Sequence, residues 1–306
     1  MAIPVIDFSK LNGSEREKTL AEIANGCEEW GFFQLVNHGI SVELLERVKK
    51  VTSECYKLRE EAFYKDSEPV KLLNDLKTGE KLDNVDWEDV FTLLDDNEWP
   101  SQPLAFKETM AEYRRELKKL AVKVMAAMDE NLGLPKGYIK NAFNGEDGSD
   151  AFFGTKVSHY PPCPTPELVN GLRAHTDAGG VILLFQDDKV GGLQILKDGQ
   201  WIDVQPLENS IVINTGDQIE VLSNGRYKSV WHRVLAGTSG NRMSIASFYN
   251  PSYKATIAPA PKLVTEAVTE EVDQAYPKFV FGDYMDVYSK QKFLPKEPRF
   301  LAVGTI

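Results

Sequence analysis

The stretch KSVWHRVLAGTSGNRMSIASFYN, Lys228–Asn250, places two runs rich in β-branched and aromatic residues on either side of a turn that contains two glycines. Runs of this composition, separated by turn residues, are typical of consecutive β-strands. The first run carries His232, and the second begins at Arg242. The stretch therefore predicts β structure on which chemically active side chains are held in place.

Similar short segments continue through most of residues 151–260. They follow the polar stretch NGEDGSD at Asn144–Asp150 and include FFGTKVSHY, VILLFQ, LQIL, WIDVQP, SIVIN and IEVLS. Many short β-rich runs with turns between them are typical of an all-β barrel or a jelly roll. We therefore expect a mainly β fold with flanking helices and a jelly-roll core.

The segments before this region alternate between helix and strand. The sequence predicts a strand at Ile3–Ser9, a helix with a capping box formed by Ser14 and Glu17, a strand at Phe32–Gly39 and a helix from about Val42. No firm assignment follows for residues 66–104. A long helix is predicted by apolar residues at steps of three or four, ending before Gly133 and Pro135: Phe106, Met110, Tyr113, Leu117, Leu120, Val124 and Met128.

A single β-core wrapped by helices is expected, not two independent domains. Its parts are an N-terminal α/β region at 1–105, a long helix and connector at 106–150, the catalytic core at 151–260 and an acidic helical tail at 261–306. The chain of 306 residues is long enough to bury a substantial core.

Charge and cysteine content restrict the class of protein. The net charge of −11 argues against nucleic acid or an anionic membrane as a partner. Three widely spaced cysteines, Cys27, Cys55 and Cys163, argue against a disulfide framework and for a reducing compartment. The sequence shows no signal peptide, membrane span or peroxisomal ending. We expect a soluble cytoplasmic protein without an obligate protein partner.

RAHTDAGG, Arg173–Gly180, contains the candidate metal ligands His175 and Asp177. On a strand, residues two apart point to the same face, so the imidazole and the carboxylate would be presented together. His232 follows 55 residues after Asp177, in another expected strand. Two histidines and one carboxylate form the facial triad of non-haem Fe(II) sites, which leaves positions open for substrate and O₂. The plainer alternative is a chance His-x-Asp in a polar turn.

Strand alternation also groups cations and hydroxyls on the faces that would carry the metal ligands. Arg173 has the parity of His175, while Arg242 shares a face with Ser244. Lys156, Ser158 and Tyr160 share a face of a third strand. A guanidinium beside a hydroxyl suits a carboxylate, so these residues are candidates for an anion site. The alternative is that they are surface charges.

The remaining histidines and one cysteine are interpreted as structural. His159 has the opposite parity to Lys156 and Tyr160, and His38 stands at a strand end beside a turn. Cys163, between prolines in YPPCPTP, is expected to be a packed thiol.

Several motifs together carry a resemblance over nearly the whole chain. LVNHG, FGTKVSHYPPCP, GLRAHTDAGGVILLFQDDKVGGLQ, NGRYKSVWHRV, RMSIASFYNP, YPKFVFGDYM and KEPRF resemble the plant Fe(II)/2-oxoglutarate-dependent dioxygenase superfamily and, within it, the 1-aminocyclopropane-1-carboxylate oxidase family. His159 departs from that family, in which many members have Asn. The stretch from Glu68 to Pro103 is the least similar and carries no functional prediction.

The resemblance implies a distorted jelly roll (double-stranded β-helix) with Fe(II) bound by His175, Asp177 and His232. It implies oxidation of 1-aminocyclopropane-1-carboxylate by O₂ and ascorbate to ethylene, CO₂ and cyanide, with bicarbonate or CO₂ as activator. Binding or supporting roles follow by motif match for a larger set of residues: Lys156, Tyr160, Arg173, Arg242, Ser244, Lys292, Glu297 and Arg299.

Two other functions fit parts of the pattern. A 2-oxoglutarate-dependent oxygenase of another small molecule would use the same triad, with Arg242 and Ser244 holding the distal carboxylate. Arg173 before His-x-Asp, together with Lys156, favours the ethylene-forming family instead. A non-enzymatic metal-binding or sensing jelly roll is the third possibility, and a triad with an open coordination face argues against it.

The ending KQKFLPKEPRF, Lys290–Phe300, is basic in an acidic chain. Composition alone favours a solvated tail. Phe293 and Phe300 are possible anchors, and the prolines lower the entropy cost of docking. We expect the segment to pack at the mouth of the core, with Lys292 and Arg299 supplying charge to the site. Truncation before Lys290 is then expected to remove activity while leaving folding and Fe(II) binding largely intact.

Overall fold

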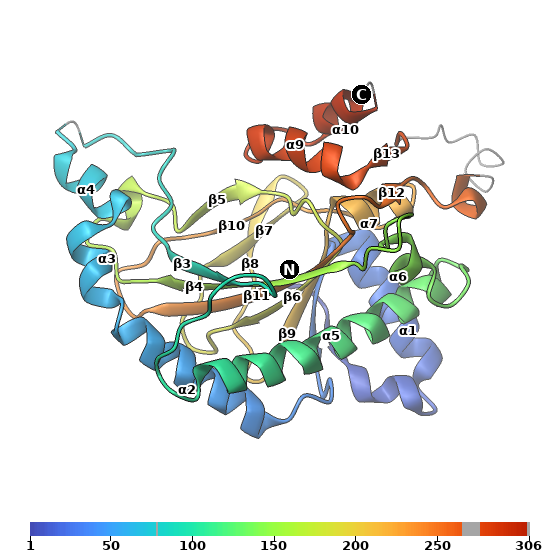
Figure 1. Ribbon diagram of the computed structural model, residues 1–306, viewed down its shortest axis with the longest axis horizontal. Helices are drawn as coiled ribbons and strands as arrows, with labels where there is room; N and C mark the ends of the chain where they lie inside the picture. Colours follow the sequence, from blue (N-terminus) through green and yellow to red (C-terminus); the bar gives the residue numbers. More distant parts are fainter. Residues whose placement is uncertain (78, 265–275, 305–306) are drawn as a thin grey trace.

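The computed structural model describes residues 1–77, 79–264 and 276–304, and its core is a pair of facing β-sheets (Figure 1). The large sheet has the order β1-β2-β9-β6-β11-β4-β3, and the small sheet has the order β5-β10-β7-β8. The strands of the large sheet are β1 (Val5–Asp7), β2 (Phe32–Val36), β3 (Asp89–Leu93), β4 (Phe152–Tyr160), β6 (Val181–Gln186), β9 (Ile211–Thr215) and β11 (Arg242–Asn250). Those of the small sheet are β5 (Leu172–His175), β7 (Leu193–Lys197), β8 (Gln200–Asp203) and β10 (His232–Val234). The mainly β, jelly-roll-like architecture expected for the core is confirmed.

Helices cover the outer face of the large sheet, where α5 (Phe106–Asn131) lies beside α2 (Val42–Lys57) (Figure 1). All seven apolar positions that predict the long helix are buried. Side chains on the outer face of the large sheet, such as those of Val157, Leu183 and Ile245, pack with this helix in one core cluster. The chain leaves α5 through Gly133, whose φ of 65° favours glycine. The outer face is thus sealed, and the inner face remains for a site.

The N-terminal region is built into the core. β1 and β2 extend the large sheet at one edge, where β2 pairs with β9, and β3 pairs with β4 at the other edge. The helices of this region and its connector are α1 (Arg16–Asn25), α2, α3 (Glu60–Asp66), α4 (Glu68–Asp75) and α6 (Tyr138–Ala142). The β3 segment falls in the stretch that the sequence left unassigned.

Two local predictions are wrong. Helix α1 begins at Arg16 with Glu15 as its N-cap, so Ser14 does not cap it. The segment IEVLS forms part of helix α7 (Asp217–Leu222), not a strand. Every residue of α7 is buried, including the polar Asp217, Gln218 and Glu220, and a segment as short as IEVLS is too short for periodicity to separate helix from strand.

The C-terminal segment crosses one end of the two sheets (Figure 1). β13 (Phe279–Val280) pairs with β12 (Thr256–Ile257), and α9 (Phe281–Gln291) and α10 (Glu297–Val303) follow. Phe281, Tyr284 and Phe300 are buried in the main core cluster. Most of the described part of the tail after β13 is helical, in α9 and α10, whereas residues 265–275, which hold much of its acidic sequence, lie outside the described residues.

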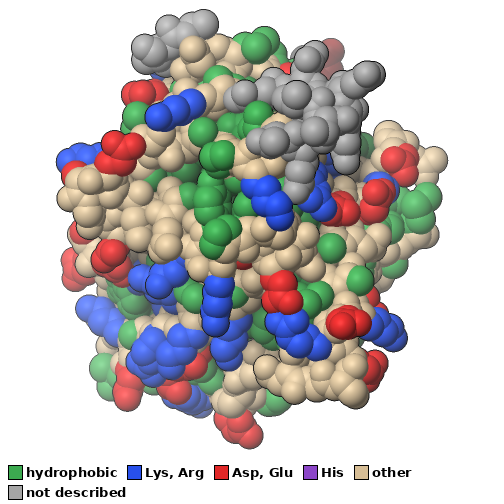
Figure 2. All heavy atoms as spheres, turned by 90° about the vertical axis from the view of Figure 1, so that its right-hand side faces the viewer, with side chains coloured by type: hydrophobic (Ala, Val, Ile, Leu, Met, Phe, Trp, Pro, Cys, Tyr) green, Lys and Arg blue, Asp and Glu red, His purple; other side chains and the backbone are tan. Residues whose placement is uncertain are grey.

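On the face that carries α1 and α6, Lys and Arg side chains are interspersed with Asp and Glu, so the exposed charge there is mixed (Figure 2). Within the described ranges, every helix is too short or too polar to cross a membrane. The three cysteines are buried free thiols.

Candidate metal centre

His175 and His232 face each other across two paired strands of the small sheet. His175 ends β5 and His232 begins β10, and the two residues are direct partners in the antiparallel register. Their ring centroids are 4.3 Å apart. The turn-separated strands predicted from the sequence therefore bring together two imidazoles that lie 57 positions apart in the chain.

Backbone carbonyls fix both rings in one tautomer. His175 Nδ1 lies 2.8 Å from the carbonyl oxygen of Arg173, and His232 Nδ1 lies 3.0 Å from that of Val230. Because a carbonyl oxygen only accepts hydrogen bonds, each Nδ1 carries a proton, and in the neutral form of such a ring the lone pair is on Nε2. Burial, together with the neighbouring His232, lowers the pKa of His175 to about 4, so this ring is a neutral ligand at pH 7.

Asp177 supplies the carboxylate, but strand alternation does not place it. β5 ends at His175, and Asp177 lies in the loop that follows. Its Oδ1 is 3.6 Å from His175 Nε2, and its Oδ2 is 3.5 Å from His232 Nε2. Asn214 Nδ2 donates to Oδ2 at 2.8 Å from β9. Burial alone would raise the pKa of Asp177, but its contacts with the histidines and Asn214 lower it below the usual range.

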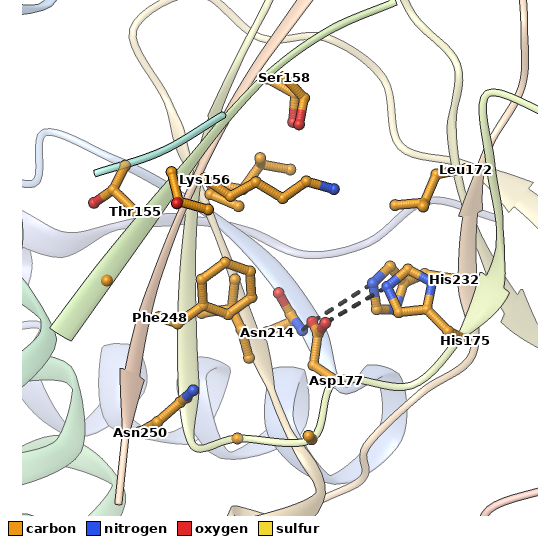
Figure 3. A pocket seen from close by; sticks show the side chains of 18 of the residues that line it. Thr155, Lys156, Ser158, Leu172, His175, Asp177, Asn214, His232, Phe248 and Asn250 are labelled. Atoms are coloured by element: carbon orange, nitrogen blue, oxygen red, sulfur yellow. Dashed lines mark hydrogen bonds and ion pairs between the residues drawn. The ribbon is translucent and has the colours of Figure 1, made fainter. Parts of the chain in front are cut away.

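The three side chains fit a divalent metal ion. Their ligand atoms all lie within 4.8 Å of one another, and the three residues are almost fully buried. Two imidazole nitrogens and one carboxylate are the donors of a facial Fe(II) site, and the carbonyl and amide contacts behind them are the orienting shell that such ligands have. Figure 3 shows the three groups converging on one point at the cavity wall.

A cavity of about 340 Å³ opens in front of the triad between the two sheets. Alternate residues of the large sheet supply one wall, and the small sheet supplies the other. Much of the wall is apolar, including Phe32, Leu172, Ile182, Leu184, Leu193, Val234 and Phe248. Its volume and its few polar groups suit a small, polar substrate held at the metal.

Arg242 and Ser244 line this cavity from β11. Arg242 is 2% exposed, and its Nη2 donates to Gln186 Oε1 at 2.8 Å. Its Nε and Nη1 have no hydrogen-bond partner in the described protein. Burial lowers the pKa of Arg242, yet a guanidinium stays charged in proteins. Two unsatisfied donors on a buried cation form a strong site for an anion.

Lys156, Ser158 and Tyr160 line the cavity from β4, and Lys156 extends toward the triad (Figure 3). Lys156 Nζ lies 2.7 Å from Glu88 Oε1, and Tyr160 Oη donates to the same oxygen at 2.9 Å. Burial, together with the Glu88 charge, raises the pKa of Tyr160 well above its usual value, so Tyr160 is a neutral donor. The sequence offered no functional prediction for Glu88.

Arg173 is not among the residues that line the cavity. Its backbone and side chain donate to both oxygens of Asp86 at 2.8–3.2 Å, and its guanidinium stacks on Phe293 at 3.8 Å. Arg173 therefore joins β5, the segment before β3 and the C-terminal segment beside the site.

The C-terminal residues divide into three groups. Lys292 lines the cavity, and burial together with the Lys156 charge lowers its pKa. Arg299 does not reach the cavity, contrary to expectation: it is fully buried and donates to Asp217 Oδ2 at 3.1 Å and to Thr176 Oγ1 at 3.0 Å. Glu297 is exposed at the start of α10. The sequence also missed Lys296, which contacts Glu220 at 2.6 Å.

The residues interpreted as structural lie away from the triad. His159 stacks on Tyr56, and its Nδ1 is 2.9 Å from Asn241 Nδ2. His38 has contacts at both ring nitrogens, with Asn209 and Ile40. Cys163 is buried in a small apolar cluster around Trp87. None of these three residues lines the metal cavity.

Comparison with known proteins agrees with this geometry. A family model described as the 2OG-Fe(II) oxygenase superfamily matches residues 152–251, and one described as the N-terminal region of non-haem dioxygenases in morphine synthesis matches residues 3–113. Both matches lie where the structure places the two sheets and the elements that extend them.

Curated plant proteins match the whole chain. 1-Aminocyclopropane-1-carboxylate oxidase 5 of Arabidopsis thaliana and 1-aminocyclopropane-1-carboxylate oxidase of Musa acuminata are each 73% identical over all of both chains. The oxidase 1 of Malus domestica is 54% identical over 98% of this chain and 95% of its own.

Solved structures show the same fold. The crystal structure of JOX2 in complex with 2OG, Fe, and JA has a TM-score of 0.78 and 33% identity, covering 99% of this chain and 89% of that chain. The dioxygenase for auxin oxidation in rice has a TM-score of 0.74 and 25% identity, covering 94% of this chain and 95% of that chain.

Proposed function

The chain belongs to the 1-aminocyclopropane-1-carboxylate oxidase family of the 2OG-Fe(II) oxygenase superfamily, and on that premise we propose that it oxidises 1-aminocyclopropane-1-carboxylate to ethylene, CO₂ and cyanide. O₂ is the oxidant and accepts two electrons from the substrate and two from ascorbate, which gives two water molecules. The observation that carries the proposal is the triad of His175, Asp177 and His232 at the wall of a small, mostly apolar cavity that holds a few polar groups. Headspace ethylene from purified protein, Fe(II), ascorbate, bicarbonate and the amino acid is the direct test.

The triad leaves one side of the metal position facing the cavity. Fe(II) bound there supplies a Lewis acid and an electron donor to O₂. Asn214 and the two backbone carbonyls hold the ligands in orientation. The apolar wall excludes water, and the small volume holds the amino acid next to the metal, which lowers the entropic cost of the encounter.

In our proposal, the cations around the cavity have different roles in anion binding. Arg242 and Ser244 bind the carboxylate of the substrate, or bicarbonate acting as activator. Lys292 adds positive charge from the C-terminal side, and Tyr160 forms part of the wall, with its one O–H donated to Glu88. Arg173 acts from outside the cavity by holding Asp86 and Phe293 in place. Arg299 acts through the placement of the C-terminal segment, and Glu297 is the first residue of the helix that carries Arg299. The buried free thiols support a cytoplasmic location.

Ethylene formation is expected to require ascorbate and to be unaffected by added 2-oxoglutarate. Measuring ethylene with each compound omitted in turn, and succinate alongside, checks this expectation. Succinate released in a fixed ratio to product would instead support a 2-oxoglutarate-dependent oxygenase acting on another small molecule. That alternative is the relevant one because JOX2, which shares this fold, was crystallised in complex with 2OG.

Arg242→Ala is expected to lower kcat/KM by about 100-fold or more, because a charged hydrogen-bond partner of a bound anion contributes roughly 2–4 kcal/mol when it is desolvated. Arg233→Ala is the matched control. Arg233 is next to His232 but stacks on Trp201 and donates to Gln194, away from the cavity. Steady-state ethylene kinetics compare the two variants, and equal losses would contradict the assignment of Arg242 to the anion site.

A further inference from the structure

Glu88 is a buried carboxylate directly behind the cavity wall. Its side chain is 7% exposed, and Oε1 accepts hydrogen bonds from Lys156 at 2.7 Å and Tyr160 at 2.9 Å. Burial alone would raise the pKa of Glu88, but Lys156, Ser158 and Tyr160 lower it below its usual value. Glu88 is therefore a fixed negative charge that contacts two residues of the cavity wall.

The backbone around Glu88 is anchored by its neighbours. Trp87 is buried, donates from Nε1 to the carbonyl of Pro161 at 2.9 Å and packs against Phe63. Asp86, on the other side of Trp87, pairs with Arg173. The buried Trp87 thus separates the two carboxylates in the sequence and anchors the backbone between them. The next residues form β3, which pairs with β4.

The two carboxylates of this segment, Asp86 and Glu88, offset the charges of two cations beside the cavity. Glu88 offsets Lys156, and Asp86 offsets Arg173. Arg242 and Lys292 line the cavity, and among the salt bridges found in the described ranges neither has a carboxylate partner within 4.0 Å. The cavity therefore carries about one positive charge less than its lysine and arginine side chains suggest.

We propose that Glu88 is a specificity-determining residue: its charge sets the cavity to accept a zwitterion or a monoanion and to disfavour a dianionic dicarboxylate such as 2-oxoglutarate. The inference rests on the proposed function, in which the substrate is an amino acid and the activator a monoanion. Lys156 without Glu88 would add a free cation beside Arg242 and Lys292. That arrangement would suit the second carboxylate of a dicarboxylic acid.

The proposal predicts that the change in affinity on removing the Glu88 charge depends on the charge of the ligand. A Coulomb interaction scales with the charge of the ligand, so removing the Glu88 charge affects a dianion twice as strongly as a monoanion on a logarithmic scale. A zwitterion of zero net charge is affected least. Damage to the cavity shape would instead weaken all ligands together.

The test is calorimetric titration of the Fe(II) holoenzyme under nitrogen with four ligands. They are the cyclopropane amino acid, acetate, succinate and 2-oxoglutarate. Glu88→Gln keeps the size and an acceptor oxygen for Lys156 and Tyr160. We expect this variant to have a dissociation constant about tenfold lower for each of the two dianions and about threefold lower for acetate. Its dissociation constant for the amino acid is expected to change by less than about twofold.

Two further variants make the result specific. Glu88→Asp retains the charge and is expected to retain the ligand preference of the unaltered protein. Glu220→Gln is the matched control, because Glu220 also accepts from one lysine and one tyrosine, Lys296 at 2.6 Å and Tyr276 at 2.8 Å, but neither of these partners lines the cavity. It is expected to leave the order of affinities unchanged.

The proposal is overturned if Glu88→Gln weakens the dianions, if it shifts all four ligands alike, or if Glu88→Asp behaves like Glu88→Gln. These titrations involve no turnover. Failure of the unaltered protein to form ethylene would overturn the proposed function, whereas the ligand-charge pattern tests Glu88 separately.

Discussion

Replacing His175, Asp177 or His232 with alanine is expected to abolish ethylene formation and to weaken Fe(II) binding by more than about 100-fold. Each change removes one of three donor atoms that lie within 4.8 Å of one another. Loss of a partner that merely orients a metal ligand already costs about 10- to 100-fold in affinity or activity, so loss of the ligand itself costs more. Anaerobic Fe(II) titration and headspace ethylene measure the two effects.

The controls for this prediction are the other two histidines. His38→Ala and His159→Ala are expected to keep Fe(II) affinity, because both rings contact protein groups away from the cavity. His159 is part of β4 and stacks on Tyr56, so its replacement is expected to affect stability rather than metal binding. A variant of His159 that lost iron as completely as the His232 variant would show that the ligand set is wrong.

The fold was predictable where side chains repeat with a clear period. The face of α5 follows the three-to-four spacing from Phe106 to Met128, and all of its apolar positions are buried. The alternation on β4 places Lys156, Ser158 and Tyr160 at the cavity and His159 behind it. Helix α7 escaped prediction because its polar residues are buried together with its apolar ones, so the order of polar and apolar residues in this short segment does not show which side faces the core.

The metal site was predictable in its residues but not in its local geometry. The type and spacing of His175, Asp177 and His232 point to a facial triad, yet Asp177 is held beyond the strand by a loop and by Asn214. Nothing in the single sequence links Asn214 to that loop, since the contact depends on the pairing of β9 and β6.

Charges brought in from distant segments were the least predictable feature. Asp86 and Glu88 flank Trp87 in a stretch without periodicity. The pairing of β3 with β4 brings Glu88 to Lys156, and a backbone bridge between Asp86 and Asn170 brings Asp86 to Arg173. The one feature of the sequence that could have drawn attention to these contacts was a tryptophan between two carboxylates. Arg299 was misplaced for the opposite reason: its charge suggested the site, while its partner Asp217 lies in a segment that was interpreted as neighbouring a strand.

The second prediction with a large expected effect concerns the buried ion pair of Arg299 and Asp217. Arg299→Ala is expected to lower the free energy of unfolding by about 3–5 kcal/mol, because removing one partner leaves a buried charge uncompensated. Arg299 and Asp217 are both fully buried, and Tyr284 donates to the same carboxylate. Urea unfolding measures the loss. The structure therefore revises the expectation for truncation before Lys290, which is now predicted to destabilise the fold as well.

The same variant is expected to lose activity through the metal loop. Asp217 donates its backbone N–H to the carbonyl of Asp177, and Arg299 also holds Thr176, the residue between two metal ligands. Glu297→Ala, in the same helix but exposed, is the matched control and is expected to keep the free energy of unfolding within about 0.5 kcal/mol. If Arg299→Ala lost turnover or gained a bicarbonate requirement with no change in the unfolding midpoint, Arg299 would act on a bound anion rather than as an anchor. If instead stability and Fe(II) affinity fall together, the C-terminal helix holds the loop that positions Asp177.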